Sequence, residues 1–386
     1  MEEIIAYIKS FLLYGNSDAA KLIGYTADET QWEKYAIIIL PNGHLGKDLI
    51  YPDWEMPKLS GKVITTDIIY NTFFFISRAE ELLTQKRDPH HRFLASYSIL
   101  GEGNRLQTPI VDEYARFLMK AMGLDFDDQP HFSGIYLTHD LDEIERFRHI
   151  RGAIGGILRG RWKQVLASWK DIKNDPVYTF DWFLSKDEDV QNRYPTLTKQ
   201  LYFAKDTQGY GYDYPQYNLQ GRDFLQLADV LRQHDARIGR HRSYYGKAFR
   251  HSDFPDFIEK NLCRCHFLRC SIEHMQQMIQ EGVTDDFTMG FADKAGFRLQ
   301  TCRPVRWINP KTMELTDLVL HPLTIMDCTL SNSNYMNLNE EDACAYCQTL
   351  VQNVKKYHGE LVLLWHNSLL LPFYPRSIYD KLLASL

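Results

Sequence analysis

The feature that most constrains the fold is an alternation of strand and helix patterns from residue 134 to the C-terminus. Such alternation is typical of parallel strands joined by crossover helices, so it predicts a β/α barrel or an open doubly wound sheet. Both architectures place functional residues at the C-terminal ends of strands. The expected strands are IYLTHD, ARIGRH, LCRCHFLR, FRLQTC, LVLHPL and ELVLLWHN, with helices over residues 221–235, 271–282 and 339–357.

The first 128 residues show a separate α/β pattern. YAIIILP and KVITTDII have strand character, and residues 109–123 read as a helix that Pro109 starts and Gly123 stops. A polar, turn-rich stretch, DFDDQPHFSG, follows, and 386 residues exceed one ordinary core. We therefore expect an N-terminal α/β domain of unknown role at 1–128 and a larger one at 129–386. The segment Asp88-Pro89-His90-His91 is expected to be a solvated loop.

Charge and composition limit which partners and which cellular location we expect. The net charge of −6 gives no reason to expect nucleic-acid binding. The N-terminal residues carry two acids where a signal peptide has a basic region, and no run approaches the roughly 18 apolar residues of a membrane span. The seven cysteines are an odd number, which suits reduced thiols. We therefore expect a cytoplasmic location.

A basic insertion near residues 145–175 interrupts the alternation. Apolar residues recur there at helical spacing, and residues 146–173 hold eight Arg or Lys against one acid, Asp171. One interpretation is a helix that packs on its own domain with a solvated basic face. The other is peripheral contact with an anionic membrane surface. The pair Gly155-Gly156 argues against one continuous helix.

Polar residues capable of chemistry stand where the expected strands end. A random distribution of polar residues would not be expected to follow that rule so often. The residues are Asp140 with Asp142, His241, His266, Arg298 and His366.

The Asp-x-Asp pair is the strongest chemical signal among these residues. Side chains alternate along an extended chain, so Asp140 and Asp142 lie on the same side and need a cation or a shared proton. One carboxylate with His241 and His266 would supply three ligands and leave a position for water, as in catalytic zinc sites. The second carboxylate would then serve as general base and His366 as proton donor. The residues alone thus predict a metal-dependent hydrolase.

At these positions the chain resembles the polysaccharide deacetylase family, also called the NodB homology domain. THDLD is similar to the family's first motif, which implies Asp140 as general base and Asp142 as metal ligand. The stretches HRSYYG, DFTMGFADKAGFR, LHPLTIMDCTL and LLWHNS extend the likeness to bacterial deacetylase-like proteins with an extra N-terminal α/β domain. The resemblance covers residues 131–386 well and the N-terminal part loosely. It implies a distorted (β/α) barrel of the polysaccharide deacetylase type.

The family's second motif has two metal histidines. GRHRSYYG offers His241 for the first, while Tyr245 stands near the place of the second. Either His266 replaces the missing ligand from the adjacent strand, or the metal is weak or absent. The resemblance also implies an arginine that orients the base, for which Arg298 is the first candidate and Arg303 the second.

The family's last motif resembles LLWHNS and implies His366 as general acid. Thr138, Tyr244 and Trp365 adjoin the motif residues and are candidates for substrate binding.

The resemblance implies a zinc-dependent hydrolase of amide bonds that removes acetyl groups from a glycan or glycan precursor. Two alternatives remain open at this point. The chain is a catalytically degenerate barrel that binds a glycan or a partner, or it is a glycosyltransferase that uses Asp-x-Asp to hold manganese and a nucleotide sugar.

Overall fold

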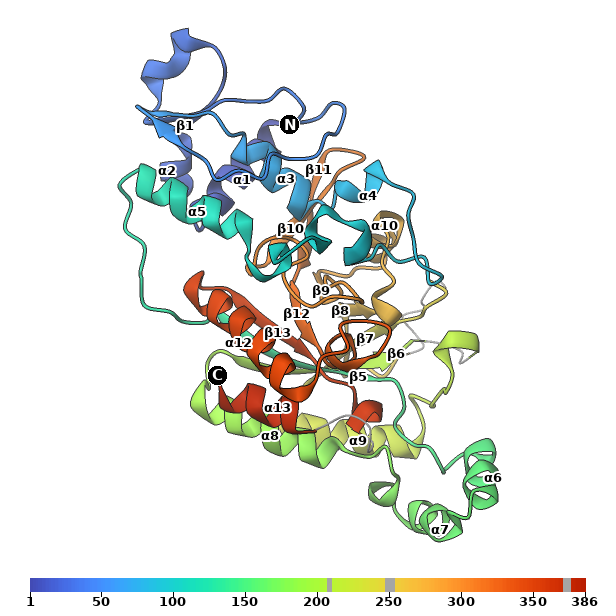
Figure 1. The fold of residues 1–386 in the computed structure, drawn as a ribbon. Coiled ribbons are helices and arrows are strands. Elements are labelled where there is room, and N and C mark those ends of the chain that lie inside the picture. The colour runs from blue at the N-terminus through green and yellow to red at the C-terminus, as the bar shows by residue number, and fades with distance from the viewer. Residues whose placement is uncertain (207–209, 247–253, 371–375) are drawn as a thin grey trace.

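The computed structural model of the protein describes residues 1–206, 210–246, 254–370 and 376–386 (Figure 1). A nine-stranded sheet in the order β10-β11-β9-β8-β7-β6-β5-β13-β12 forms the C-terminal two-thirds, and every pairing in it is parallel except β10 with β11. Its strands are β5 (Gly134–Leu141), β6 (Thr198–Lys205), β7 (Arg237–Arg242), β8 (Ile258–Cys265), β9 (Asp285–Asp286), β10 (Val305–Asn309), β11 (Glu314–Leu320), β12 (Leu323–Met326) and β13 (Glu360–Leu364).

The sheet curls into a half-barrel. Strands β11 and β12 lie near opposite ends of the sheet, yet His321 and Pro322 alone join them along the chain. Three residue steps span at most about 11 Å, so the two ends must approach each other. Backbone bonds from Leu323 N to Met289 O (3.1 Å) and from His321 N to Asp286 O (2.8 Å) hold them there. The prediction of a mixed α/β fold with a parallel sheet is confirmed in this form.

Side chains alternate between the inside and the outside of the curl. The inner cluster contains residues of β5, β6, β8, β12 and β13, namely Tyr136, Leu201, Phe203, Leu262, Leu323, Met326, Val362 and Leu364, together with Leu268 and Phe287. The residues between them face the helices that cover the outer side. These helices are α8 (Phe180–Arg193), α9 (Arg222–Gln233), α10 (Ile272–Gln280), α12 (Glu340–Lys356) and α13 (Arg376–Ala384).

The N-terminal segment lies at the upper end of the molecule in Figure 1 and has its own four-stranded sheet, β1-β2-β4-β3. Its elements are α1 (Glu2–Leu12), α2 (Ser17–Lys21), β1 (Ile23–Tyr25), β2 (Ile37–Ile39), β3 (Leu59–Ser60), β4 (Val63–Ile64), α3 (Ile68–Ile76), α4 (Glu80–Leu83) and α5 (Ile110–Ala121). One hydrophobic cluster runs from these helices into β8, β10, β11 and α10. The division into two domains stays a prediction, since this core is shared.

Two expectations about strands are wrong. FRLQTC was expected to be a strand, but residues 297–302 form turns, in which Gln300 has a φ of 56° and Phe297 N bonds to Leu106 O (2.8 Å). In addition, β6 was not foreseen, although residues 201–204 (LYFA) form a short apolar run that is buried on both faces. The break in the basic insertion falls at Gly160 (φ 73°) between α6 (Ile150–Leu158) and α7 (Trp162–Lys170) rather than at Gly155-Gly156.

None of the helices in the described ranges combines the length and the apolar character needed to pass through a lipid bilayer.

His321 joins the two ends of the curl and generates a stability prediction. Its Nδ1 contacts Glu360 on β13 (2.7 Å), its Nε2 contacts Asp285 on β9 (3.2 Å), and its ring stacks on Phe287. Burial alone would lower the pKa of His321, but the two carboxylates outweigh it and raise the pKa to about 9. The protonated imidazole therefore stabilises the fold below its ordinary pKa of 6.5, and this contribution is lost as pH rises through 9.

We expect His321→Gln to lower the free energy of unfolding by up to about 3 kcal/mol at pH 6 and by much less at pH 10. Denaturant unfolding of both proteins at the two pH values measures the difference. An equal loss at both values would contradict a charged imidazole at this closure.

Candidate functional site

The candidate site lies at the C-terminal ends of four parallel strands of the curled sheet. On three of these strands, the inward-facing row of side chains changes from apolar to polar near the C-terminal end. Tyr136 is followed by Thr138 and Asp140 on β5, Leu262 by Arg264 and His266 on β8, and Val362 by Leu364 and His366 on β13. The two-residue period of a strand therefore brings these polar groups to one mouth of the curl.

Asp142, His241 and His266 form a group whose ligand atoms lie within 4.8 Å of one another. Asp142 Oδ1 is 3.4 Å from His241 Nε2 and 3.2 Å from His266 Nε2. Two ligands about 2.0–2.1 Å from a shared tetrahedral zinc lie roughly 3.3 Å apart, so the spacing fits such an ion.

Unpaired polar atoms at the centre of the group support the same interpretation. Among the buried side-chain atoms that the structure describes, Asp142 Oδ1 and His241 Nε2 have no hydrogen-bond partner. Buried polar atoms without a partner are costly unless something else, such as a cation, satisfies them. The residues present therefore fit a divalent metal.

The far nitrogens of both histidines are held in place. His241 Nδ1 lies 3.1 Å from Arg264 O, and His266 Nδ1 lies 2.8 Å from Asp213 Oδ1. Contacts of this kind fix the ring and leave Nε2 available, as in most metal-binding histidines. Burial lowers the pKa of His266, but Asp142 and Asp213 outweigh it and raise the pKa to about 9.

Asp140 lies beside this group and is paired with an arginine from β8. Arg264 Nη1 donates to Asp140 Oδ1 (3.0 Å), while Asp140 Oδ2 faces His241 Nε2 (3.6 Å) and His366 Nε2 (3.8 Å). Burial would raise the pKa of Asp140, but His241, Arg264 and His366 outweigh it and lower the pKa. One carboxylate oxygen is thus fixed and the other is directed into the site.

His366 approaches from β13 and is anchored by Asp327. Its backbone N donates to Asp327 Oδ2 (2.7 Å), its Nδ1 contacts Asp327 Oδ1 (2.8 Å), and its Nε2 lies 3.9 Å from Asp142 Oδ2. Burial lowers the pKa of His366, but Asp327, Asp140 and Asp142 outweigh it and raise the pKa to about 9. The ring therefore presents a protonated Nε2 to the two carboxylates.

A cavity of about 240 Å³ opens onto Asp140, Asp142, His266 and His366. Its wall includes Arg92, from the N-terminal segment, which donates to Phe267 O (3.1 Å) and Tyr335 Oη (3.0 Å). Asp88 pairs with Arg92 at 2.7 Å, and both side chains are buried. The expectation of a solvated loop at residues 88–91 is thus wrong at Asp88, which is buried against Arg92 of the cavity wall.

Arg298, expected to orient the base, lies elsewhere. It donates to Glu81 Oε1 (2.8 Å) and Gly290 O (2.7 Å), because its segment packs on the N-terminal helices rather than in the sheet. Arg303, the second candidate, pairs with Asp112 of α5. The arginine that contacts Asp140 is Arg264, so the expectation that Arg298 or Arg303 does so is wrong.

The three residues expected to bind substrate lie in different environments. Thr138 is buried, and its hydroxyl donates to Leu363 O (2.5 Å). Trp365 is adjacent to His366 in the sequence and therefore points to the opposite, outer side of the sheet, where its ring packs on Tyr379. Both predictions are corrected by these positions. Tyr244 lies in an aromatic group with Phe267, and its role stays a prediction.

Tyr245 takes no part in the group of Asp142, His241 and His266. Its ring stacks on Tyr210 at 4.6 Å and its hydroxyl accepts from Tyr212 N (3.3 Å). The histidine that completes the three is His266, one of the two alternatives foreseen from the sequence.

Four functional groups were missed by sequence reasoning. Arg264 and Lys205 stand at inward positions of strands and could have been found from the alternation; Lys205 Nζ lies 3.9 Å from Asp142 Oδ1. Asp213 and Asp327 carry no signal in the sequence, because they reach the histidines from turns and a short helix, α11 (Asp327–Ser331).

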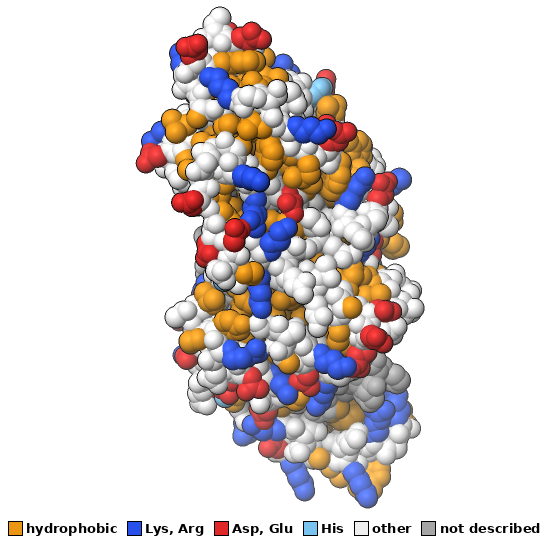
Figure 2. All heavy atoms as spheres, turned by 60° about the vertical axis from the view of Figure 1, so that its left-hand side comes forward, with side chains coloured by type: hydrophobic (Ala, Val, Ile, Leu, Met, Phe, Trp, Pro, Cys, Tyr) orange, Lys and Arg blue, Asp and Glu red, His pale blue; other side chains and the backbone are white. Residues whose placement is uncertain are grey.

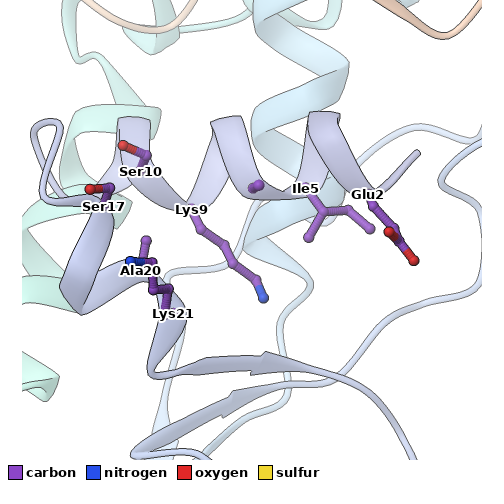
Figure 3. A pocket seen from close by; sticks show the side chains of 8 residues that line it. Glu2, Ile5, Lys9, Ser10, Ser17, Ala20 and Lys21 are labelled. Carbon is purple, nitrogen blue, oxygen red and sulfur yellow. The ribbon is translucent and has the colours of Figure 1, made fainter.

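A shallower pocket of about 370 Å³ lies between α1 and α2 (Figure 3). Lys9 reaches across it to donate to Ile23 O (2.7 Å), and Lys21 pairs with Asp18. Its described lining holds one carboxylate, Glu2, and no imidazole, so we assign it no catalytic role.

Comparisons with known proteins add little about function. Residues 11–127 match a family described as a family of unknown function, DUF7033. No curated protein matches the chain at a significant level.

Two solved structures show some likeness to the chain. A "putative polysaccharide deacetylase" from Mycobacterium smegmatis is 10% identical, with a TM-score of 0.40 over 68% of this chain and 85% of that one. A "putative polysaccharide deacetylase involved in O-antigen biosynthesis" from Bordetella bronchiseptica is 14% identical, with a TM-score of 0.33 over 65% and 89%. At these scores the likeness does not establish a shared fold.

The geometry predicts which side chains govern metal affinity. We expect His266→Ala to abolish stoichiometric zinc binding, and Asp213→Asn to weaken it about 10–100-fold, because the second change removes only the partner of a ligand. Calorimetric titration with zinc, and the absorption spectrum of the cobalt form, measure both effects. Tyr245→Phe is the matched control and should bind zinc with wild-type affinity. If this variant bound zinc more weakly, Tyr245 would have to take part in the metal site.

Proposed function

We propose that the protein is a metal-dependent hydrolase that removes an acetyl group from a sugar of a glycan or glycan precursor. The observation that carries the proposal is the convergence of Asp142, His241 and His266 around unpaired polar atoms, with Asp140 and His366 beside them. Hydrolysis follows from these groups, whereas the acetyl group and the sugar rest on the motifs THDLD and LLWHNS.

The division of labour follows from the contacts of each residue. Asp142, His241 and His266 would hold the metal, and zinc is the ion that this donor set suits best. Such an ion, when bound, lowers the pKa of a water molecule and stabilises negative charge on a carbonyl oxygen.

Asp140 and His366 would move the protons. Asp140 Oδ2 accepts a proton from water, because Arg264 holds the other oxygen and keeps the carboxylate oriented. His366 Nε2 delivers a proton to the leaving nitrogen, while Asp327 fixes the opposite side of the ring. Asp140 Oδ2 and His366 Nε2 lie 3.8 Å apart and both line the cavity, so both can reach the same reacting group of a substrate bound there.

The size of the cavity supports a small reacting group. Its volume of about 240 Å³ is below the roughly 300–1,000 Å³ of sites for drug-sized ligands, and it suits about one sugar ring. The convergence of three histidines favours this activity over a nucleotide-sugar transferase, which would need the two carboxylates but not the histidines. It also favours an active site over a degenerate one.

Asp140→Asn separates the base from the metal. We expect this variant to bind zinc as the wild type does and to lose about 10²–10⁴-fold in turnover, because a carboxamide cannot accept the proton. Acetate release from acetylated amino sugars, together with the metal content, measures the two properties. If zinc-loaded wild-type protein releases no acetate from any acetylated amide or ester of a sugar, the proposed function is wrong.

His366→Ala tests the proton donor. Turnover of amide substrates should fall about 10²–10⁴-fold, whereas esters with a good leaving group should be affected less, since their departure needs no proton. Comparing the two substrate classes measures this dependence. An equal loss on both would assign His366 to another step.

Arg92 tests whether the N-terminal segment shapes the pocket. We expect Arg92→Lys to raise KM several-fold with a smaller change in kcat, because a lysine cannot hold Phe267 O and Tyr335 Oη at once. Steady-state kinetics measure the two constants. Arg87→Lys, in the same segment but bonded to Thr84 O and Glu81 O, is the matched control and should leave both unchanged.

A further inference from the structure

Helices α6 and α7 form a hairpin that projects from the lower right of the molecule in Figure 1. Few contacts tie it to the body. Arg148 pairs with Asp223 of α9 (2.8 Å). Within the insertion, Asp175 accepts hydrogen bonds from Arg146 N and Phe147 N, and Trp169 Nε1 donates to Phe147 O (2.7 Å), which closes the base of the hairpin. The hairpin is thus held at its base, and most of its surface has no neighbour within the described chain.

The inner side of the hairpin is closely packed. A side-chain carbon added at Gly156 would lie 2.6 Å from Val165 Cγ2, so glycine is required where the two helices cross. Val165 and Phe147 are both buried at this contact. The two helices therefore satisfy each other on one face and do not need a further partner to fold.

The outer side of the hairpin is apolar and exposed. Seven large apolar side chains on it are between 51% and 82% exposed, far more than the structure shows for most of its apolar residues. They are Ile150, Ile154, Ile157, Leu158, Trp162, Leu166 and Trp169. An exposed apolar group of this size marks an interaction surface.

The charge of the hairpin indicates the chemistry of its partner. Residues 150–170 contain five cationic side chains and no acid, and all five are exposed. None of them has a salt-bridge partner among the described residues. They are Arg151, Arg159, Arg161, Lys163 and Lys170. At the lower end of Figure 2, Lys and Arg side chains project beside hydrophobic ones.

We propose that the α6–α7 hairpin docks the protein on an anionic lipid surface. Exposed aliphatic residues with two tryptophans suit the boundary between headgroups and acyl chains, and the surrounding cations suit anionic headgroups. A second copy of this chain is a poorer occupant, because a symmetric contact would bring the five cations of one hairpin against those of the other.

Docking would bring the strand ends of the candidate site near the lipid. Asn367, next to His366, donates to Glu143 O (2.6 Å) at the start of the insertion and to Val177 O (3.0 Å) just beyond its end. The insertion therefore leaves and rejoins the body beside the site. The lipid contact itself does not depend on the proposed hydrolysis, so either can fail without the other.

Vesicle binding of the full chain tests the proposal. We expect co-sedimentation with vesicles of phosphatidylcholine containing about one third phosphatidylglycerol, weaker binding to phosphatidylcholine alone, and a decrease with added salt. The variant Arg159→Gln/Lys163→Gln should bind about thirty-fold more weakly, since each basic residue near an anionic surface contributes roughly a five-fold factor. The variant Leu158→Ser/Trp162→Ser/Leu166→Ser should lose binding to both kinds of vesicle.

Matched controls make the outcome decisive. Lys34→Gln/Lys58→Gln removes two exposed cations from the N-terminal segment, and Leu22→Ser removes a side chain that is 50% exposed; both should bind as the wild type does. Circular dichroism checks that each variant is folded. The proposal is overturned if folded wild type binds neither vesicle, or if the hairpin variants bind like the controls. It is equally overturned if the wild type is a dimer that the triple serine variant converts to a monomer.

Discussion

The alternation of side chains in a curled parallel sheet is the constraint on which the rest of the structure depends. One row of each strand fills the inner core, and the same row continues into the site once the apolar residues end. On β13, Val362 and Leu364 therefore determine that His366 faces inward and Trp365 outward. A shift by one residue would turn both the apolar core residues and the polar groups of the candidate site to the other face of the sheet. Packing and chemistry are thus set by one register.

That register also explains how the site tolerates Tyr245 where a histidine was expected. Strands β7 and β8 are paired in parallel, with His241 opposite Arg264, so the next inward position on β8 is His266. A neighbouring strand thus brings a second imidazole to Asp142 and His241. Asp213 contacts Nδ1 of His266 at 2.8 Å, which fixes the orientation of this buried imidazole.

Sequence reasoning predicted the strand ends because a two-residue period is visible in a single chain. It placed Asp140, His241, His266 and His366 correctly at one mouth, and the same period would have found Arg264. It failed at Arg298, where a short apolar pattern was taken for a strand although no strand pairs with it. Asp213 and Asp327 were out of reach for another reason: their contacts join segments 53 and 39 residues apart. Only the folded chain reveals such contacts.

Buried charges bind the N-terminal segment to the half-barrel. Arg298 shares Glu81 with Arg78 of the N-terminal segment, and Arg303 pairs with Asp112, all three contacts being buried. Burying an unpaired guanidinium costs several kcal/mol. The carboxylates Glu81 and Asp112 of the N-terminal segment therefore stabilise Arg298 and Arg303, which would otherwise be buried without a carboxylate partner. The same packing brings Arg92 to the cavity wall. The N-terminal segment is therefore part of the architecture that forms the pocket, rather than an appendage to it, and the pocket depends on both segments folding together.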